Sequence, residues 1–288
     1  MGTTWRKHLK QEFTQEKRSL KTKHPQLILL SQWRFHPYVW LIYRIITAVY
    51  TLVWCICSGV QTNHPKWFIF LTHLTYTVLT FYFNLALVNL ICYMICGLKR
   101  PAQNIRAASL EEISSCNPAV PEIEVETPAL NLHTEFSPPS SLLYPTICVQ
   151  WSLYNLSCVV SLFVTIAFWS FDYIPGRAPD SVNINVHVVN SVLVLLELGM
   201  TASPIHLAHF IYTLLYCLSF IIFTVIYWAA GGTNLRGKPY IYRSLNYSET
   251  PGVAVGCIIG SICLLIPFLQ FMVWNFHFLK CKAYLKLK

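Results

Sequence analysis

Six long apolar stretches constrain this chain more than any other feature of its sequence. Each provides roughly the 20 consecutive, mostly apolar residues that an α-helix needs to cross the ~30 Å hydrocarbon layer of a bilayer. They cover residues 39–60, 67–95, 145–171, 186–202, 209–230 and 252–276. Because a backbone in lipid has to satisfy its own hydrogen bonds, these stretches are predicted to be helices. The expected fold is therefore all-α, a polytopic membrane bundle of about six transmembrane helices.

The composition also favours a lipid environment. Only 11% of the residues are charged and 55% are hydrophobic, whereas a soluble domain carries about 25% charged residues. Most of the 11 cysteines fall inside the predicted spans, where a thiol packs as a small apolar group, so no disulfide framework is expected. The sequence has no zinc spacing and no basic–aromatic pattern of a nucleic-acid-binding protein. We expect membrane lipids as partners, and no nucleic acid, metal or cofactor.

The basic residues predict the orientation of the bundle. Fifteen Lys and Arg residues lie in the N-terminal arm, the C-terminal tail and the loop between spans two and three, against five on the opposite side. Basic residues near span ends tend to stay cytoplasmic, so both termini are predicted to be cytoplasmic. The first 25 residues lack the apolar core of a cleavable signal peptide, and the first span is expected to act as a signal anchor. The sequon at Asn246 then falls on the lumenal or extracellular side, as a glycosylation site requires.

The chain divides into three parts around the spans. Residues 1–38 form a basic cytoplasmic arm, of which we expect residues 1–30 on the membrane surface, residues 39–279 form the bundle, and residues 280–288 form a basic tail. The bundle includes one long acidic loop, residues 101–144, whose Pro, Ser and Glu content predicts disorder. Cys281, between two lysines in the tail, is a candidate acylation site, although an unmodified thiol fits the same context. The Gly, Pro and Tyr content of residues 231–242 predicts a structured cap with tyrosines at the depth of the lipid headgroups.

Polar residues within the spans are the best leads to function, because a charge at the centre of a membrane helix costs about 2.5–3.5 kcal/mol. Arg44 lies near the cytoplasmic end of span one and is expected to snorkel to lipid phosphates. Span four carries a polar stripe that covers about a third of the helix circumference and is predicted to face the bundle interior. The stripe consists of His187, Asn190, Ser191, Glu197 and Thr201. Glu197 is expected close to the midplane, in a neutral or hydrogen-bonded state.

Span two carries further polar residues, and we expect its stripes and that of span four to face each other. Thr72 lies about 7 Å inside the outer end of span two, and His187 lies at a similar depth in span four. A hydroxyl nucleophile needs a base within hydrogen-bond reach, and the matching depths permit this arrangement. Thr72 and His187 are therefore a candidate catalytic pair. The alternative is that these groups only form hydrogen bonds between helices and hold the bundle together.

Several short motifs together resemble the rolling stone family. The most specific is Tyr227-Trp228-Ala229-Ala230-Gly231-Gly232-Thr233-Asn234. Supporting motifs occur in order along the chain at Ser31-Gln32-Trp33, Leu41-Ile42-Tyr43-Arg44, Asn185-Val186-His187, His209-Phe210-Ile211-Tyr212 and Pro239-Tyr240-Ile241-Tyr242. This resemblance implies a multi-pass plasma-membrane protein that acts in myoblast fusion or muscle development.

A weaker similarity reaches the androgen-induced transmembrane hydrolases. Their Thr-bearing motif resembles Phe70-Leu71-Thr72, and their His motif resembles the stretch from His187 to Leu193, although an ungapped alignment places their histidine at Val189. This similarity implies an intramembrane esterase that cleaves fatty acid esters of hydroxy fatty acids with a Thr and a His.

Three functions therefore stay open from the sequence. The first is a non-enzymatic membrane protein of cell fusion or adhesion, and the second is a lipid ester hydrolase that uses Thr72 and His187. The third is a transporter or channel built on Glu197 and His187, which the lack of an internal repeat disfavours.

Overall fold

The structure, a computed structural model, describes residues 12–22, 24–33, 35–95, 143–173, 176 and 178–286. Within these residues it contains helices and one isolated bridge between Ser31 and Thr201, but no strand. Six of its helices are long and apolar enough to cross a membrane, which confirms the predicted fold class. The chain is therefore a multi-pass membrane protein. The predicted acidic loop lies outside the described residues, except for Leu143 and Tyr144, which begin the third span.

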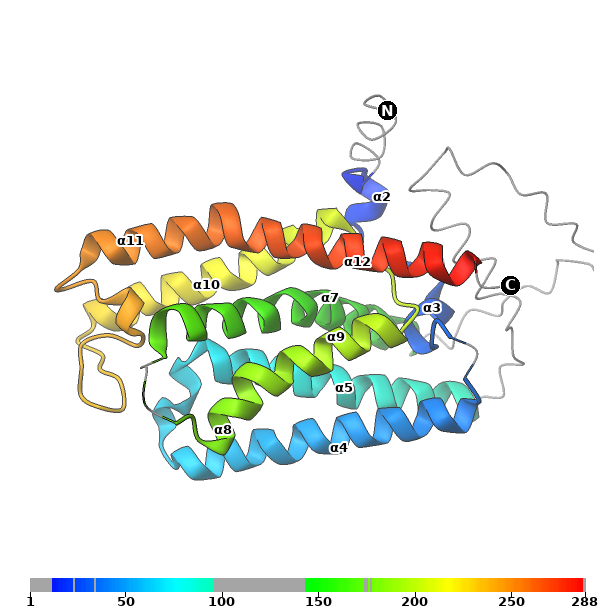
Figure 1. Cartoon of the computed structure of the whole chain (residues 1–288), viewed down its shortest axis with the longest axis horizontal. Helices are drawn as coiled ribbons and strands as arrows, with labels where there is room; N and C mark the ends of the chain where they lie inside the picture. Colours follow the sequence, from blue (N-terminus) through cyan, green and yellow to red (C-terminus); the bar gives the residue numbers. More distant parts are fainter. Residues whose placement is uncertain are drawn as a thin grey trace, which may run out of the picture.

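The spans run side by side in alternating directions (Figure 1). The first three are α4 (Pro37–Thr62), α5 (Leu71–Ile95) and α7 (Leu143–Ala167), the last with a π-helical extension, η2 (Phe168–Asp172). The fourth consists of α8 (Ser181–Ile184), the π-helix η3 (Asn185–Val189) and α9 (Asn190–Met200), and the fifth of the 3₁₀ turn η4 (Leu207–His209) and α10 (Phe210–Ala229). The sixth consists of α11 (Pro251–Gly260), the π-helix η6 (Ser261–Leu265) and α12 (Ile266–Lys286). We call the end of the bundle that holds residues 12 and 286 the terminal end, and the end that holds residues 230–250 the loop end.

All six predicted spans are helices, but two differ by five or more residues from their predicted bounds. The fourth begins at Ser181, five residues before its predicted start, because the Asp180 side chain caps the helix by accepting the Asn183 N–H at 2.8 Å. The sixth continues to Lys286 at the terminal end, so most of the predicted tail is helical. The hydropathy pattern could not reveal either extension, because both consist of polar or charged turns.

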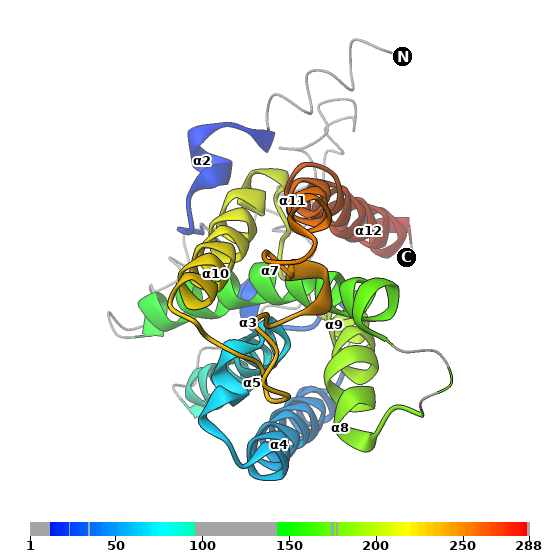
Figure 2. The same ribbon diagram turned by 90° about the vertical axis from the view of Figure 1, so that its left-hand side faces the viewer.

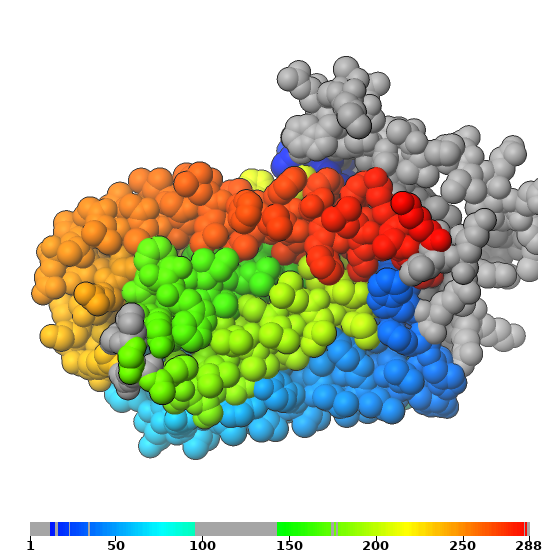
Figure 3. Space-filling model, in the orientation of Figure 1, coloured from blue at the N-terminus to red at the C-terminus, as the bar shows by residue number. Residues whose placement is uncertain are grey.

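Helix α7 lies at the centre of the bundle. Seen from the loop end, it separates α4, α5 and α9 from α10, α11 and α12 (Figure 2). It contacts α5, α9, α10 and α12 along its length. The helices close into one continuous body in the space-filling view (Figure 3).

Helix α4 has the opposite arrangement to an amphipathic helix of a soluble protein. Its outward face is an apolar stripe with a residue every three or four positions: Val39, Ile42, Ile46, Val49, Val53, Ile56 and Val60. Its buried face is mostly polar: Trp40, Arg44, Thr47, Ala48, Thr51 and Ser58. Lipid is as apolar as leucine, so helix association in a membrane relies on small and polar residues inside and leaves the apolar ones outside.

A buried ion pair joins three of the spans near the terminal end. Arg44 of α4 is 0% exposed, and its Nη1 lies 2.8 Å from Oε1 of Glu197 on α9. The same carboxylate accepts hydrogen bonds from the hydroxyls of Tyr82 on α5, at 2.6 Å, and Tyr43 on α4, at 2.8 Å. The Arg44 guanidinium also lies over the Trp40 ring, 4.4 Å from its centroid.

The expectation that Arg44 snorkels to lipid phosphates is therefore wrong. Glu197 supplies a counter-charge inside the bundle, which removes the reason for the guanidinium to leave it. Glu197 is hydrogen-bonded as expected, and it lies three residues before the end of α9 at Met200. Its partner Tyr82 lies halfway along α5, so the carboxylate meets that span at mid-length.

The N-terminal arm packs into the terminal end of the bundle. Helix α3 (Pro25–Leu29) is wholly buried, and the Ile28 carbonyl accepts a hydrogen bond from Gln150 of α7 at 3.1 Å. The Leu30 carbonyl accepts the Ala202 N–H at 3.1 Å, and the Gln32 N–H donates to the Met200 carbonyl at 2.9 Å. Residues 1–30 of the arm were expected on the membrane surface, and for residues 25–30 this is wrong. These contacts satisfy backbone groups of the turn after α9 that would otherwise be unpaired.

Residues 230–250 form the predicted structured cap at the loop end. Lys66 Nζ donates to Thr233 Oγ1 at 2.8 Å and to the Asn234 carbonyl at 3.2 Å. Gly231 has a φ of 75°, and a Cβ on Gly232 would overlap the ring and the carbonyl oxygen of Tyr227. Both positions therefore require glycine, which explains the Gly-Gly pair in the Tyr-Trp-Ala-Ala-Gly-Gly-Thr-Asn motif.

We predict that the Arg44→Met variant is about 3–5 kcal/mol less stable than the wild type, because it leaves the Glu197 carboxylate buried without its counter-charge. Glu197→Gln is expected to destabilise for the converse reason. The double variant is expected to cost less than the sum of the two single changes, since the residues interact directly. Thermal unfolding in detergent measures these losses of stability, with the exposed Arg243→Met as control. Strictly additive losses in the double variant would contradict the predicted interaction.

Candidate functional site

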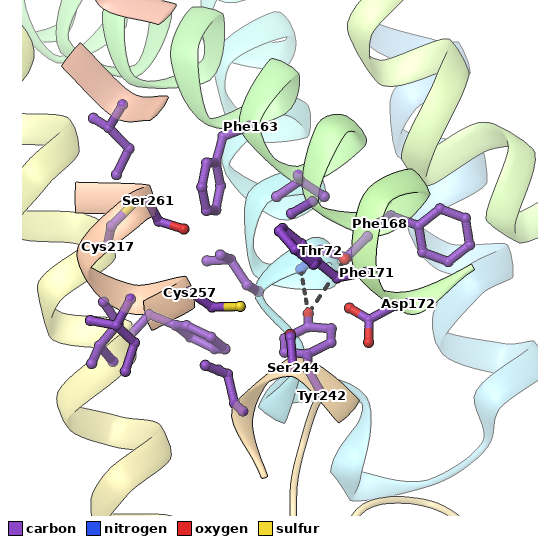
Figure 4. A pocket seen from close by; sticks show the side chains of 18 of the residues that line it. Thr72, Phe163, Phe168, Phe171, Asp172, Cys217, Tyr242, Ser244, Cys257 and Ser261 are labelled. Carbon is purple, nitrogen blue, oxygen red and sulfur yellow. Dashed lines mark hydrogen bonds between the residues drawn. The ribbon is translucent and has the colours of Figure 1, made fainter. Parts of the chain in front are cut away.

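A cavity of about 90 Å³ lies between the spans toward the loop end. That is several times the ~10–15 Å³ that one water molecule requires. Its walls come from α5, α7, η2, η3, α10, α11, η6, the start of α12 and the cap; Figure 4 shows part of this lining. Apolar walls with a few polar groups are typical of a small-molecule site.

Thr72 lies in the first turn of α5, at the edge of this cavity. Its backbone N–H donates to the hydroxyl of Tyr242 at 3.3 Å, and its Oγ1 lies 3.4 Å from the same hydroxyl. The first N–H groups of a helix have no partner within the helix, so Tyr242 caps α5 from the cap (Figure 4). Burial raises the pKa of Tyr242, so the hydroxyl stays protonated at neutral pH and can donate.

His187 lines the same cavity from the fourth span. Its ring stacks on Phe168 of η2, with the ring centroids 3.7 Å apart and the planes 8° from parallel. Its Nδ1 is buried and has no hydrogen-bond partner among the described residues. The structure thus brings the predicted pair Thr72 and His187 to one cavity, but no hydrogen bond joins these two described residues.

Asp172, Tyr242 and Ser244 complete the polar part of the cavity, and the sequence did not single them out as site residues. Asp172 ends η2, and its Oδ1 accepts the Arg243 N–H at 3.3 Å. Tyr242 was expected at headgroup depth, but its hydroxyl points inward to Thr72. An acidic residue at the end of a span and a tyrosine in a Pro-Tyr-Ile-Tyr run were the available signals. Neither showed that these residues meet.

The polar stripe of span four is buried, but it pairs mainly with span three. Thr165 Oγ1 on α7 lies 3.2 Å from Asn190 Oδ1 and 2.7 Å from Ser191 Oγ. Among the described residues of this stripe, only Glu197 forms a hydrogen bond with span two, which it accepts from Tyr82. The expectation that the stripes of spans two and four face each other therefore holds for Glu197 alone among these three residues, because α7 occupies the space next to Asn190 and Ser191.

The two candidate modification sites are both buried. Asn246 is 5% exposed, and its Nδ2, which would carry a glycan, donates to Glu249 at 2.8 Å. The Cys281 side chain is 4% exposed, with its Sγ 3.6 Å from His277 Nε2 and 3.8 Å from Gln32 Oε1. The sequence placed Cys281 in an accessible tail, but α12 continues through this position and packs it against the arm. This packing counts against glycosylation and acylation of the folded protein.

No group of three His, Cys, Asp or Glu side chains within the described ranges is placed to hold a metal ion.

Comparisons with known proteins agree on one family. A family model described as Protein rolling stone matches residues 143–286, which span α7 to α12. Protein rolling stone of Drosophila melanogaster is 24% identical over 249 residues, which cover 84% of this chain and 79% of that protein. No solved structure matches the chain.

The loop end provides a test of membrane orientation. We predict that the double substitution Arg236→Asn and Lys238→Thr, in the exposed turn of the cap, creates a sequon that becomes glycosylated. Wild type is expected to stay unmodified, because the Asn246 amide is buried. Electrophoretic mobility before and after peptide-N-glycosidase treatment measures the glycosylation of the wild type and of the variant. An Arg236→Gln, Lys238→Thr control lacks the acceptor, and an unmodified sequon variant in normally expressed protein would indicate the opposite orientation.

Proposed function

The chain belongs to the rolling stone family, and from this premise we propose that it acts in cell fusion, such as that of myoblasts, or in muscle development. Family membership is the observation that carries this proposal. The family model covers the second half of the chain, including the cap and every helical element that lines the cavity except α5.

We place this role at the plasma membrane, with both termini in the cytoplasm. The support is the excess of basic residues, fifteen against five, on the side of the terminal end. The same basic side is attracted to the anionic lipids of a cytoplasmic leaflet.

The geometry favours a role within the membrane rather than direct contact with an opposite cell. At the loop end, the segments between spans are residues 63–70, 173–180 and 230–250, all short. The longest of them is anchored to the bundle by Lys66, which donates to Thr233, and by its own Tyr242, which contacts Thr72. A surface this close to the bilayer can act on neighbouring lipids or on membrane proteins of the same cell.

Loss of the protein from cultured myoblasts of its own species is expected to reduce the fraction of nuclei in multinucleate cells. Re-expression of the wild type is expected to restore that fraction. Surface biotinylation of a tagged copy in the same cells checks the plasma-membrane location. Normal fusion in cells that have lost the protein would refute the proposed role.

A second candidate function is an intramembrane lipid ester hydrolase, and one observation favours it: Thr72 and His187 line one cavity. In such a reaction Thr72 Oγ1 attacks the ester carbonyl while His187 takes its proton. The alcohol leaves with that proton and an acyl-threonine forms. Water then cleaves the acyl-threonine, which releases the fatty acid and restores the hydroxyl. Tyr242, which already contacts Thr72, is placed to donate a hydrogen bond to the oxyanion.

Covalent labelling of the purified protein with a fluorophosphonate probe tests this candidate. If Thr72 is a nucleophile, the wild type is labelled and Thr72→Ala loses the label. Thr80→Ala is the matched control, because Thr80 is a buried threonine of α5 outside the cavity, bonded to the Thr51 carbonyl. Equal labelling of Thr72→Ala and wild type would exclude this chemistry.

A further inference from the structure

Three π-helical segments converge on the cavity. Such segments hold fewer than about 1% of residues in proteins and often mark functional sites. Within the described part of the chain there are three, η2, η3 and η6, of five residues each. Every one places side chains on the cavity: Phe168, Phe171 and Asp172 from η2, His187 from η3, and Ser261 and Ile262 from η6. Irregular backbone segments in three separate spans thus contribute to the walls of one cavity.

The cavity is polar at one end and apolar along its length. Thr72, Asp172, His187, Tyr242 and Ser244 gather at the loop end. The apolar walls continue along α7 as far as Phe163, nine residues or about 13 Å before Asp172. This shape matches a molecule with a polar head and an apolar chain.

The polar end has hydrogen-bonding capacity that the protein does not use. The Nδ1 of His187 is buried without a partner among the described residues, and a buried polar atom without a partner is destabilising. The contacts of the Tyr242 hydroxyl with Thr72 are long, at 3.3 and 3.4 Å. A ligand hydroxyl at this end could donate a hydrogen bond to His187 Nδ1 and accept one from the Tyr242 hydroxyl.

The charges at this end select against an anion. Among the described residues that line the cavity, one is acidic, Asp172, and none is Lys or Arg. Arg243 bonds Asp172 through its backbone N–H and its charge acts on the Asp172 carboxyl, but its side chain is exposed and does not line the cavity. A phosphate or carboxylate head would therefore face Asp172 with no counter-charge in the lining.

The cavity opens toward the surface that faces lipid. Phe171 of η2 is 48% exposed, more than any other residue of the lining, and Ala167, Ser261 and Ile262 on the η2 and η6 sides are half-buried. These residues belong to membrane spans, so a ligand enters from the bilayer.

From these observations we propose that the cavity is a binding site for a neutral acylglycerol of the bilayer. The glycerol hydroxyls lie among Tyr242, His187 and Asp172, and the acyl chain lies along α7 between η2 and η6. The proposal shares its location with the hydrolase candidate but concerns binding, and it holds whether or not an ester is cleaved.

Photo-crosslinking of the full-length protein in phosphatidylcholine nanodiscs tests the proposal. The probe is a monoacylglycerol with a photoreactive, clickable acyl chain, and the comparison is lysophosphatidate with the same chain, which differs only by its phosphate. We expect the neutral probe to label peptides of η2 or of α11–η6, and the anionic probe to label them about tenfold less. Equal labelling by both probes, or labels only on outward-facing residues, would overturn the proposal.

Two variants and one control separate the cavity from general lipid contact. Ala167→Trp narrows the opening, and His187→Phe keeps the ring stack on Phe168 but removes the ring nitrogens. Each is expected to lower labelling about tenfold, which corresponds to about 1.4 kcal/mol. Val192→Trp, on a lipid-facing position that is 48% exposed, is expected to leave labelling unchanged. Undiminished labelling in both cavity variants would refute the site.

The outcome also distinguishes this proposal from the hydrolase candidate. Lipid cross-links in the cavity of a protein that no fluorophosphonate labels would support binding and exclude catalysis by Thr72. A labelled Thr72 without acylglycerol cross-links would do the reverse.

Discussion

The carboxylate of Glu197 is the interaction on which the arrangement of the spans depends. It holds Arg44 and Tyr43 of α4 and Tyr82 of α5, so one group connects three spans. Just beyond it, Lys280 of α12 donates to the carbonyls of Leu198, at 2.9 Å, and Thr201, at 2.6 Å. In lipid each of these charges alone is costly, and together they fix which helices are neighbours.

Hydropathy predicted the number and order of the spans because membrane insertion depends on the same quantity. Hydropathy does not predict which residues far apart in the sequence contact each other. Arg44 and Glu197 each appeared as the single Asp, Glu, Lys or Arg of its predicted span, and their contact follows from how α4 and α9 pack. The same holds for the site: matching depth brought Thr72 and His187 to one cavity, but the inward turn of Tyr242 depends on the fold of the cap.

The two ends of the bundle have different designs. The terminal end is tied by charges, by α3 and by backbone hydrogen bonds, and it is closely filled. The loop end carries the π-helical segments and the cavity, whose walls include half-exposed side chains. A rigid base that supports a more open site is a common solution where a binding region requires freedom that the rest of the fold does not.

The docking of the N-terminal arm has a consequence for the order of biosynthesis. Ile28, Leu30 and Gln32 are made early, but their partners Gln150, Met200 and Ala202 are more than a hundred residues further along the chain. During translation the arm can complete these contacts only when the third and fourth spans are in place. The terminal end therefore closes late, and residues 25–33 are made early but are among the last to fold.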